Sequence, residues 1–387
     1  MKVRYITIFA LVAGLLSITL TIGCGNDQHV GLLPKFLFTI GDADLGAYTV
    51  DAKTGAITVV TGSPFTSGFS ASPCPDLAAA DPKGTLLYVP DECNDNIAAF
   101  TIDSKTGALT VVAGAPFASG TGNFSVQQPV IDPSGKFLYI PEDDSPGLVL
   151  GFKIGTGGAL TAITGSPFTA GGNNETIVIH PTGKFLYTAD GNDVGGTPGP
   201  SISAYSMDGS SGVLTPVTGS PFALGDVPKF LAIDKAGKYL FATGPETDTI
   251  LAFSINSSTG AITAITGSPF AAGGPNPQDI AVSTDGKFLF VANNGDLDVP
   301  TNGSVSAFTI DATSGAITPV AGSPFTAGPN PKRLATDPSG KFLYATNEDS
   351  DNMSVFSIDA KTGVLTTVTG SPFATNIGSE GVTITHQ

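Results

Sequence analysis

Seven polar residues recur about fifty residues apart, each at or just before the apolar part of a short expected strand. They are Asp76, Gln127, Glu175, Lys229, Gln278, Lys332 and Glu380. Arg333, the only arginine beyond residue 4, directly follows Lys332. Carboxylates, amides and cations gathered at one place could bind a polar small molecule. The alternative is a set of solvated strand starts with no ligand.

Well-known catalytic sequence motifs are absent from this chain. It has no nucleophile elbow, no His-Glu-x-x-His zinc motif and no phosphate-binding loop. The three histidines, His29, His180 and His386, fall in well-separated parts of the chain. They cannot share one zinc ion, whose ligands must all lie about 2 Å from the metal. We therefore expect no catalytic metal and no cofactor.

The net charge of −16 restricts the possible partners. Because the chain would repel phosphate backbones, we exclude nucleic acid as a partner. The acidic balance either serves solubility alone or contributes to cation binding.

A tetrapeptide repeat defines the elements that must position these residues. Gly-Ser-Pro-Phe, or Gly-Ala-Pro-Phe, begins at Gly62, Gly114, Gly165, Gly219, Gly267, Gly322 and Gly370. A period near 50 residues indicates one supersecondary unit repeated along the chain.

Residues 331–373 show a complete unit. Its expected strands are A (332–336), B (341–346), C (353–358) and D (364–369). Asp337-Pro-Ser-Gly340 predicts a turn between A and B, and a Gly-containing hairpin turn joins C to D. Because proline cannot donate a ladder hydrogen bond, the strand before Ser-Pro should be the outer edge. Four-stranded antiparallel sheets at this period are typical of propeller blades.

The chain ends predict ring closure. Only three strands precede the first Gly-Ser-Pro-Phe, at 35–40, 46–50 and 56–61. A lone strand A, 380–385, follows the last copy. We therefore predict an all-β, seven-bladed β-propeller over residues 34–387, whose last blade combines the C-terminal strand with three N-terminal strands. Closure leaves no exposed inner sheet edge.

This topology predicts two different faces. The loops entering strand A and the B–C loops share one face, around the channel mouth, and the A–B and C–D turns share the other. The B–C loops are rich in acidic residues, whereas Lys83, Lys136, Lys184, Lys238, Lys287 and Lys341 lie in or just after A–B turns. Acidic loops could hold Ca²⁺, but none matches an EF-hand pattern. We expect a monomer with a small-molecule or protein ligand at the acidic channel mouth.

The unit Asp-Pro-Ser-Gly-Lys-Phe-Leu-Tyr, an Asn/Asp-rich loop, then Ser-x-Phe-x-Ile-Asp-x-x-Thr-Gly-x-Leu-Thr resembles the lactonase-like seven-bladed propellers. That family includes 6-phosphogluconolactonase and muconate cycloisomerase propellers, and the resemblance covers residues 34–387. The resemblance implies lactone hydrolase activity. It also implies a site on the channel-mouth face, where active members of the family use His, Glu and Arg. Here Glu175 or Glu380 would be the general base, and Lys332 with Arg333 the anion clamp. The matching residues are turn and core positions, and no histidine precedes strand A.

Residues 1–24 resemble a targeting segment. Lys2 and Arg4 precede an apolar run that ends in Gly23-Cys24. This ending resembles a bacterial lipobox, which makes Cys24 the candidate for lipidation and 25–33 a tether. Ordinary secretion or an uncleaved anchor are the alternatives. We expect an exported protein of the bacterial envelope, or a secreted one, that meets the membrane only through its lipid.

Two cysteines remain in the expected domain, Cys74 and Cys93, on either side of a predicted hairpin. In an oxidising compartment they could form a disulfide, with two free thiols as the alternative.

The polar mouth and acidic loops favour a binding or scaffolding role at the cell envelope. The alternative functions are a lactone hydrolase acting at the same mouth and an adhesin that uses the acidic loops.

Overall fold

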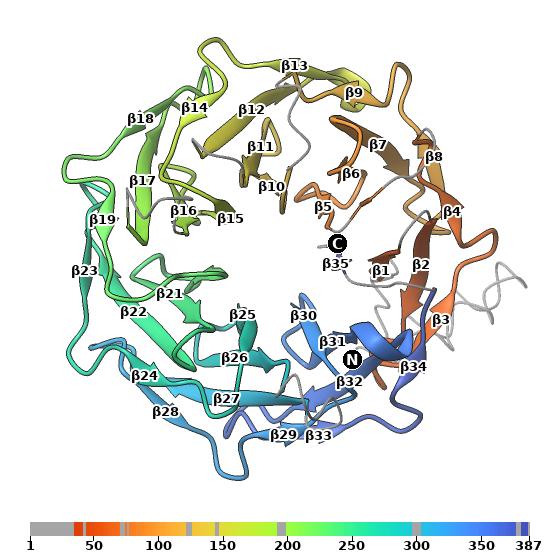
Figure 1. Ribbon diagram of the computed structural model, residues 1–387. Helices are drawn as coiled ribbons and strands as arrows, with labels where there is room; N and C mark the ends of the chain where they lie inside the picture. Colours follow the sequence, from red (N-terminus) through yellow and green to blue (C-terminus); the bar gives the residue numbers. More distant parts are fainter. Residues whose placement is uncertain are drawn as a thin grey trace, which may run out of the picture. The chain divides into compact units, whose positions relative to one another are not determined.

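The computed structural model describes residues 35–41, 44–69, 74–75, 77–120, 126–143, 147–191, 199–295, 303–376 and 381–385. The chain divides into two compact units, 1–33 and 34–387, and all described residues belong to the second. In this unit seven antiparallel sheets are arranged around a ring (Figure 1). Blades 1 to 6 follow in chain order, and blade 7 combines both ends of the unit.

Each blade has strands A to D from the inside outward, and a short fifth strand. The A strands are β5 (Ala79–Ala80), β10 (Val130–Ile131), β15 (Asn174–Ile179), β20 (Leu231–Ile233), β25 (Pro277–Val282), β30 (Pro331–Thr336) and β35 (Gly381–Ile384). The B strands are β6 (Leu86–Asp91), β11 (Phe137–Glu142), β16 (Phe185–Asp190), β21 (Tyr239–Gly244), β26 (Phe288–Asn293), β31 (Phe342–Asn347) and β1 (Lys35–Ile40). The C strands are β7 (Asn96–Ile102), β12 (Leu148–Ile154), β17 (Ser201–Met207), β22 (Thr249–Ile255), β27 (Ser304–Ile310), β32 (Asn352–Ile358) and β2 (Asp44–Val50).

The D strands are β8 (Leu109–Val111), β13 (Leu160–Ala162), β18 (Leu214–Pro216), β23 (Ile262–Ala264), β28 (Ile317–Pro319), β33 (Leu365–Thr367) and β3 (Ile57–Val59). The fifth strands are β9 (Phe117–Ala118), β14 (Phe168–Thr169), β19 (Phe222–Ala223), β24 (Phe270–Ala271), β29 (Phe325–Thr326), β34 (Phe373–Ala374) and β4 (Phe65–Thr66). Two short 3-10 turns, η2 (Thr156–Gly158) and η3 (Glu348–Ser350), complete the described elements. No described helix is long and apolar enough to cross a membrane.

The fifth strand corrects the prediction of four strands per blade. After strand D the chain makes a turn through a cis Ser-Pro or Ala-Pro bond, and the phenylalanine pairs again with the same C strand. In blade 2, for example, the Ser166 hydroxyl accepts the Gly151 N–H at 2.9 Å, between β13 and β14. The tetrapeptide therefore interrupts and resumes the outer edge. This arrangement leaves only very short segments exposed to edge pairing.

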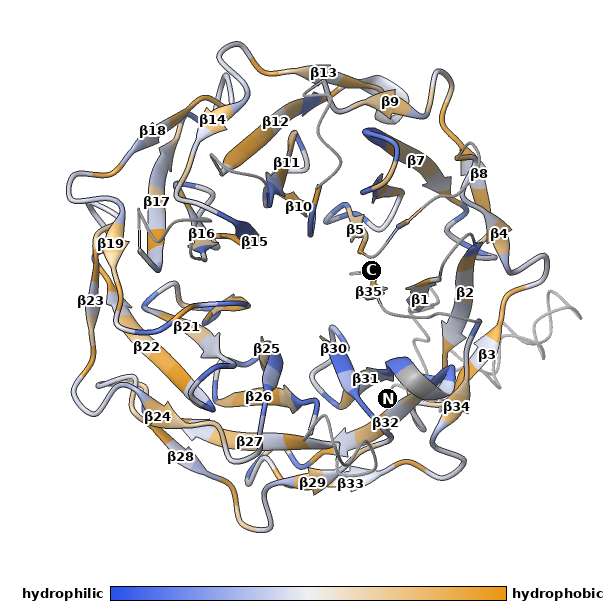
Figure 2. Cartoon of the chain, viewed as in Figure 1, coloured by the Kyte–Doolittle hydropathy of each residue, from blue (hydrophilic) through white to orange (hydrophobic). Residues whose placement is uncertain are grey.

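The hydrophobic core lies between neighbouring blades, because the B and C strands are apolar on both faces. One cluster joins Phe36 and Phe38 of blade 7 to Leu87 and Phe100 of blade 1, with Phe65 packed against it. The expected packing of the tetrapeptide phenylalanines between sheets is confirmed: each is partly buried against such a cluster. In Figure 2, hydrophobic colour dominates β12 and β22, whereas β15 and β30, about the centre of the ring, each include a hydrophilic stretch.

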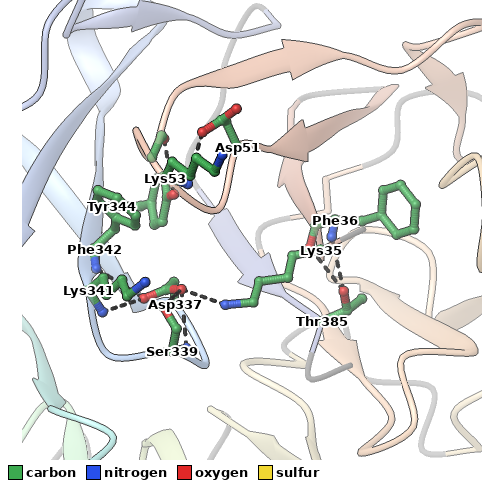
Figure 3. Close-up of polar contacts among 11 residues, drawn as sticks. Lys35, Phe36, Asp51, Lys53, Asp337, Ser339, Lys341, Phe342, Tyr344 and Thr385 are labelled. Carbon is green, nitrogen blue, oxygen red and sulfur yellow. Dashed lines mark hydrogen bonds and ion pairs between the residues drawn. The ribbon is translucent and has the colours of Figure 1, made fainter. Parts of the chain in front are cut away.

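Ring closure is confirmed by β35, which pairs antiparallel with β1 from Leu37–Ile384 to Ile40–Gly381. Each A strand also contacts the next, from β5 round to β35 and back to β5. Figure 3 shows the seam: Phe36 exchanges hydrogen bonds with Thr385, and the Lys35 ammonium donates to Asp337 of blade 6 at 2.6 Å. Burial alone would raise the pKa of Asp337, but hydrogen bonds from Lys35, Ser339 and the Phe342 N–H outweigh it and lower that pKa.

Candidate functional site at the channel mouth

β-Bulges lie at the start of three A strands, at the loop-face end of the channel. In β15, β25 and β30 the pairing register with the B strand shifts by one residue, at Glu175, Gln278 and Lys332. A bulge redirects the side chains on either side of it and is common next to functional sites. Three of the seven aligned polar residues therefore occupy a special backbone position that the sequence pattern alone did not reveal.

The described aligned residues have distinct partners. Lys332 donates to Glu348 in η3 at 3.0 Å, and the Gln278 amide donates to Asn276 at 2.5 Å. Gln127 and Lys229 bond through their backbone N–H groups to the carbonyls of Pro141 and Thr243, each at 2.9 Å. Asp76, Glu380 and the side chain of Glu175 lie outside the described residues, so the predicted ring of seven remains a prediction.

Arg333 is the best-defined cation of this end of the channel. Its side chain is only 6 % exposed, and its guanidinium lies over the ring of Phe230, 4.3 Å from the centroid. Phe230 belongs to blade 4 and Arg333 to blade 6, so the arginine reaches past the start of blade 5. From the sequence, the nearest carboxylate partners of Arg333 are expected to be Glu380 or the Glu348 loop; Glu348 is paired with Lys332, and Glu380 lies outside the described residues.

Asp279, in the intervening blade 5, is the residue that the sequence interpretation missed. Its carboxylate accepts the N–H of Ile280 and, across the blade boundary, that of Leu334, both at 2.7 Å. Burial raises the pKa of Asp279, while the charge of Arg333 and these two N–H groups lower it, and the net shift is upward. Aligning the residue after each ring position reveals the signal: Leu77, Gln128, Thr176, Phe230, Asp279, Arg333 and Gly381. The two charged members have opposite signs and lie in adjacent blades.

Buried polar side chains at the ends of the B strands form hydrogen bonds with the neighbouring C strands. Asp190 accepts hydrogen bonds from the hydroxyls of Thr188, Ser201 and Ser203, at 2.6, 3.0 and 2.6 Å. Desolvation raises the pKa of Asp190 to about 6, even though these hydroxyls lower it. The amides of Asn293 and Asn347 occupy the same position in blades 5 and 6 and bond to serine hydroxyls of their C strands. These hydrogen bonds join the ends of the B strands to the starts of the C strands.

In blade 1 a disulfide joins Cys74 to Cys93, with their Cα atoms 5.4 Å apart. Asp91, at the end of β6, accepts the backbone N–H groups of both cysteines, at 3.0 and 3.1 Å. The bond therefore links the chain entering strand A to the B–C loop, on the face of the channel mouth.

The described loop face is strongly acidic. Its acidic side chains are Asp44, Asp91, Glu92, Asp95, Glu142, Asp143, Asp190, Asp226, Glu246, Asp248, Asp279, Glu348 and Asp351. Lys229, Lys332 and Arg333 are its described cations. Within the described ranges, no three His, Cys, Asp or Glu residues are grouped so that they could hold a metal ion.

Comparison with known proteins identifies the family. The family described as "Lactonase, 7-bladed beta-propeller" matches residues 41–278 and 266–376, which together make up most of the chain. The chain belongs to this lactonase propeller family. A 6-phosphogluconolactonase of Formosa agariphila is 40 % identical over 75 residues. That match spans 19 % of this lactonase propeller and only 20 % of the relative's length.

Solved structures share the fold of this lactonase propeller at low sequence identity. A proposed 6-phosphogluconolactonase of Bacteroides fragilis has a TM-score of 0.75 at 19 % identity, covering 92 % of this chain and 99 % of the other. The periplasmic gluconolactonase of Pseudomonas aeruginosa has a TM-score of 0.71 at 17 % identity, covering 91 % and 99 %. These likenesses concern the fold alone.

Proposed function

We propose that this lactonase propeller hydrolyses an uncharged lactone at the loop-face mouth of its channel. The observation that carries the proposal is the buried Arg333, held beside Asp279 and against Phe230 in a chain of the lactonase family. A fixed guanidinium in a partly desolvated channel can stabilise the negative charge that develops on a lactone carbonyl oxygen.

The chemistry requires few protein groups. Water adds to the carbonyl carbon, a base takes its proton, and the ring C–O bond breaks to leave a hydroxy acid. In this proposal Arg333 binds the carbonyl oxygen, and Asp279 positions Arg333. Glu175 or Glu380 acts as the general base, as the family resemblance suggests.

The charge balance favours an uncharged substrate over a phosphorylated one. Lys332 is engaged by Glu348 at 3.0 Å, and the charge of Arg333 is offset by Asp279. A phosphate ester needs concentrated positive charge, and the acidic loop face would repel it. The mouth is therefore better suited to a neutral sugar-type lactone.

The experiment is a lactonase assay on the wild type and on Arg333→Ala, with Lys136→Ala on the turn face as the matched control. We expect kcat/KM to fall at least about 100-fold in the first variant. The control should stay within about twofold, since this substitution leaves the mouth intact. Arg333→Lys, which keeps a cation, guards against a folding defect, with the melting temperature measured for each protein. Equal rates for the wild type and Arg333→Ala would remove Arg333 from the site.

The acidic loop face favours a second candidate, a binding or scaffolding protein of the envelope. Such a protein would hydrolyse no lactone in the assay above and would retain a cationic partner in pull-downs. Substituting the described loop carboxylates by amides should then abolish that retention. Equal recovery by the two proteins would reject this candidate.

We further propose that the protein is exported and anchored by a lipid on Cys24. Three observations support it: the basic and apolar leader ending in Gly23-Cys24, the Cys74–Cys93 disulfide, and the likeness to a periplasmic gluconolactonase. The lipid would be the only contact with the membrane that this function requires.

A further inference from the structure

A hollow of about 400 Å³ lies on the opposite face of the propeller, between the A–B turns of blades 4 and 5. Its walls include Lys235, Lys238, Lys287, Tyr239, Ile310 and Ala312. A second hollow of about 370 Å³ shares Lys235 and extends to the ends of the A strands at Ile233, Val282 and Thr336. Neither belongs to the channel-mouth site.

A departure from the repeat places a cation at the hollow. In blades 1 and 2 the second turn residue is a proline that fills the space beside the next blade's turn. A Cβ at Gly135 would lie 3.6 Å from Pro82, and a Cβ at Gly183 would lie 3.7 Å from Pro133. Blade 4 has Lys235 at this position and blade 5 has Thr284. Lys235 packs beside the next turn as the prolines do, because a Cβ at Gly286 would lie 3.7 Å from the Lys235 Cβ, and its side chain adds a cation at the edge of the hollow.

Three lysines and two carboxylates, Asp234 and Asp285, line the hollow, and both carboxylates are engaged with other groups. Asp234 is buried and uses its carboxylate to accept the N–H groups of Ala236, Lys238 and Tyr239, at 3.1, 2.6 and 2.7 Å. Asp285 is paired with Lys287 at 2.8 Å. Among the described residues, neither Lys235 nor Lys238 has a side-chain ion pair or hydrogen bond.

We propose that this hollow binds a doubly charged oxyanion of the phosphate type. The Lys235 and Lys238 ammonium groups, which make no ion pair among the described residues, can bind such an ion, and lysine is a common point-charge partner of phosphate. The floor formed by Tyr239, Ile310 and Ala312 would accept an apolar part of the molecule that carries the anion. The phosphate could come from a soluble phosphomonoester or from a lipid headgroup.

The test is titration of the full propeller with inorganic phosphate and with glycerol 3-phosphate at fixed ionic strength. We expect Lys235→Pro and Lys238→Ala each to lower the association constant about tenfold. Lys235→Pro restores the residue of the turns in blades 1, 2, 3 and 6, so it should fold normally while removing this cation from the hollow. Lys136→Ala removes a turn lysine beside an intact proline and should change the constant less than about twofold. Equal losses in all three variants, or no loss in Lys235→Pro, would overturn the proposal.

Co-sedimentation with vesicles that contain phosphatidic acid, a lipid phosphomonoester, against pure phosphatidylcholine vesicles, distinguishes the two sources. Lys235-dependent binding to the anionic vesicles assigns the site to a lipid headgroup. Lys235-dependent binding of the soluble anions alone assigns it to a soluble phosphomonoester. Absence of both kinds of binding in the wild type rejects the site.

Discussion

At the scale of single residues, the scaffold carries several buried ionisable groups whose environments differ. Asp190 is desolvated and has only uncharged hydrogen-bond donors among the described residues, three hydroxyls and the Ser203 N–H, whereas Asp279 has a neighbouring arginine. The equivalent positions to Asp190 in blades 5 and 6 hold asparagine, which pairs with the same kind of serine hydroxyl without a charge. Asp190 therefore contacts serine hydroxyls as these asparagines do, but burial disfavours its charged form.

The burial of Asp190 predicts a pH dependence. The folded pKa of about 6 lies above the ordinary 3.8, so the folded protein binds the Asp190 proton more tightly than the unfolded chain. The stabilisation is fully present below about pH 4 and is lost as the pH rises through 6. Relative to the wild type, Asp190→Asn should therefore gain up to about 3 kcal/mol in unfolding free energy between pH 4 and pH 7. Urea unfolding at several pH values measures it. A difference between the two proteins that does not change with pH would contradict the assignment.

The site could be predicted from the sequence only in part, because some of its residues are placed by strand pairing and by contacts between blades. The aligned polar positions could be read from the repeat, because each blade is the same unit. The shifts at Glu175, Gln278 and Lys332 depend on the pairing of two strands, which no single strand encodes. The link between Asp279 and Arg333 crosses a blade boundary, and it was detectable only by comparing neighbouring positions of different blades.

At the scale of elements, contacts between a B strand and the next blade's C–D turn hold the blades together. The Tyr139 hydroxyl donates to the Gly212 carbonyl at 2.6 Å, and Tyr88, Tyr187 and Tyr344 make the same contact in their blades. Gly212 has φ of +79°, and a Cβ there would lie 2.6 Å from both Phe137 and Ile163. The turn glycine is thus required by backbone conformation and by packing together.

Gly212→Ala should destabilise the fold by about 2–4 kcal/mol, since it adds both left-handed strain and overpacking. Gly209→Ala, in the same turn, is the matched control, because nothing lies within 4 Å of its added Cβ. That control should change the stability by less than about 0.5 kcal/mol. Guanidinium unfolding curves compare the two, and similar losses would refute this account of the interface.

The four main strands of each blade could be predicted because their apolar patterns and turn residues repeat. The fifth strand could not, because two residues after a proline carry no pattern of their own. Its existence depends on the N–H and C=O groups that the C strand leaves unpaired beyond the end of strand D.

At the scale of the whole propeller, the two faces differ in charge. The described loop face carries mainly carboxylates, whereas the turn face is more balanced. Its described lysines are Lys53, Lys83, Lys105, Lys136, Lys184, Lys235, Lys238, Lys287, Lys341 and Lys361, and its described turn aspartates are Asp51, Asp81, Asp103, Asp132, Asp208, Asp234, Asp285, Asp311, Asp337 and Asp359. Both the predicted closure and this division follow from the repeat, since every blade places its turns on one face and its loops on the other.

The proposed lipid anchor makes a prediction for the full-length chain. Cys24→Ser should lose incorporation of labelled fatty acid and move from the detergent phase to the aqueous phase, because the acyl chains supply the membrane affinity. Intact Cys74 and Cys93 serve as internal controls, since they should take up no label. Unchanged labelling of the variant would rule out Cys24 as the modified residue.

Hydrolysis of an uncharged lactone at the channel mouth can be tested by the selectivity of the wild-type protein between a neutral lactone and a phosphorylated one. The measurement is the initial rate of acid release from a neutral sugar lactone and from its 6-phosphate, each corrected for spontaneous opening. We predict that the protein hydrolyses the neutral lactone with a kcat/KM at least about tenfold above that of the phosphorylated lactone. A preference for the phosphorylated lactone, or no turnover of either, would contradict it.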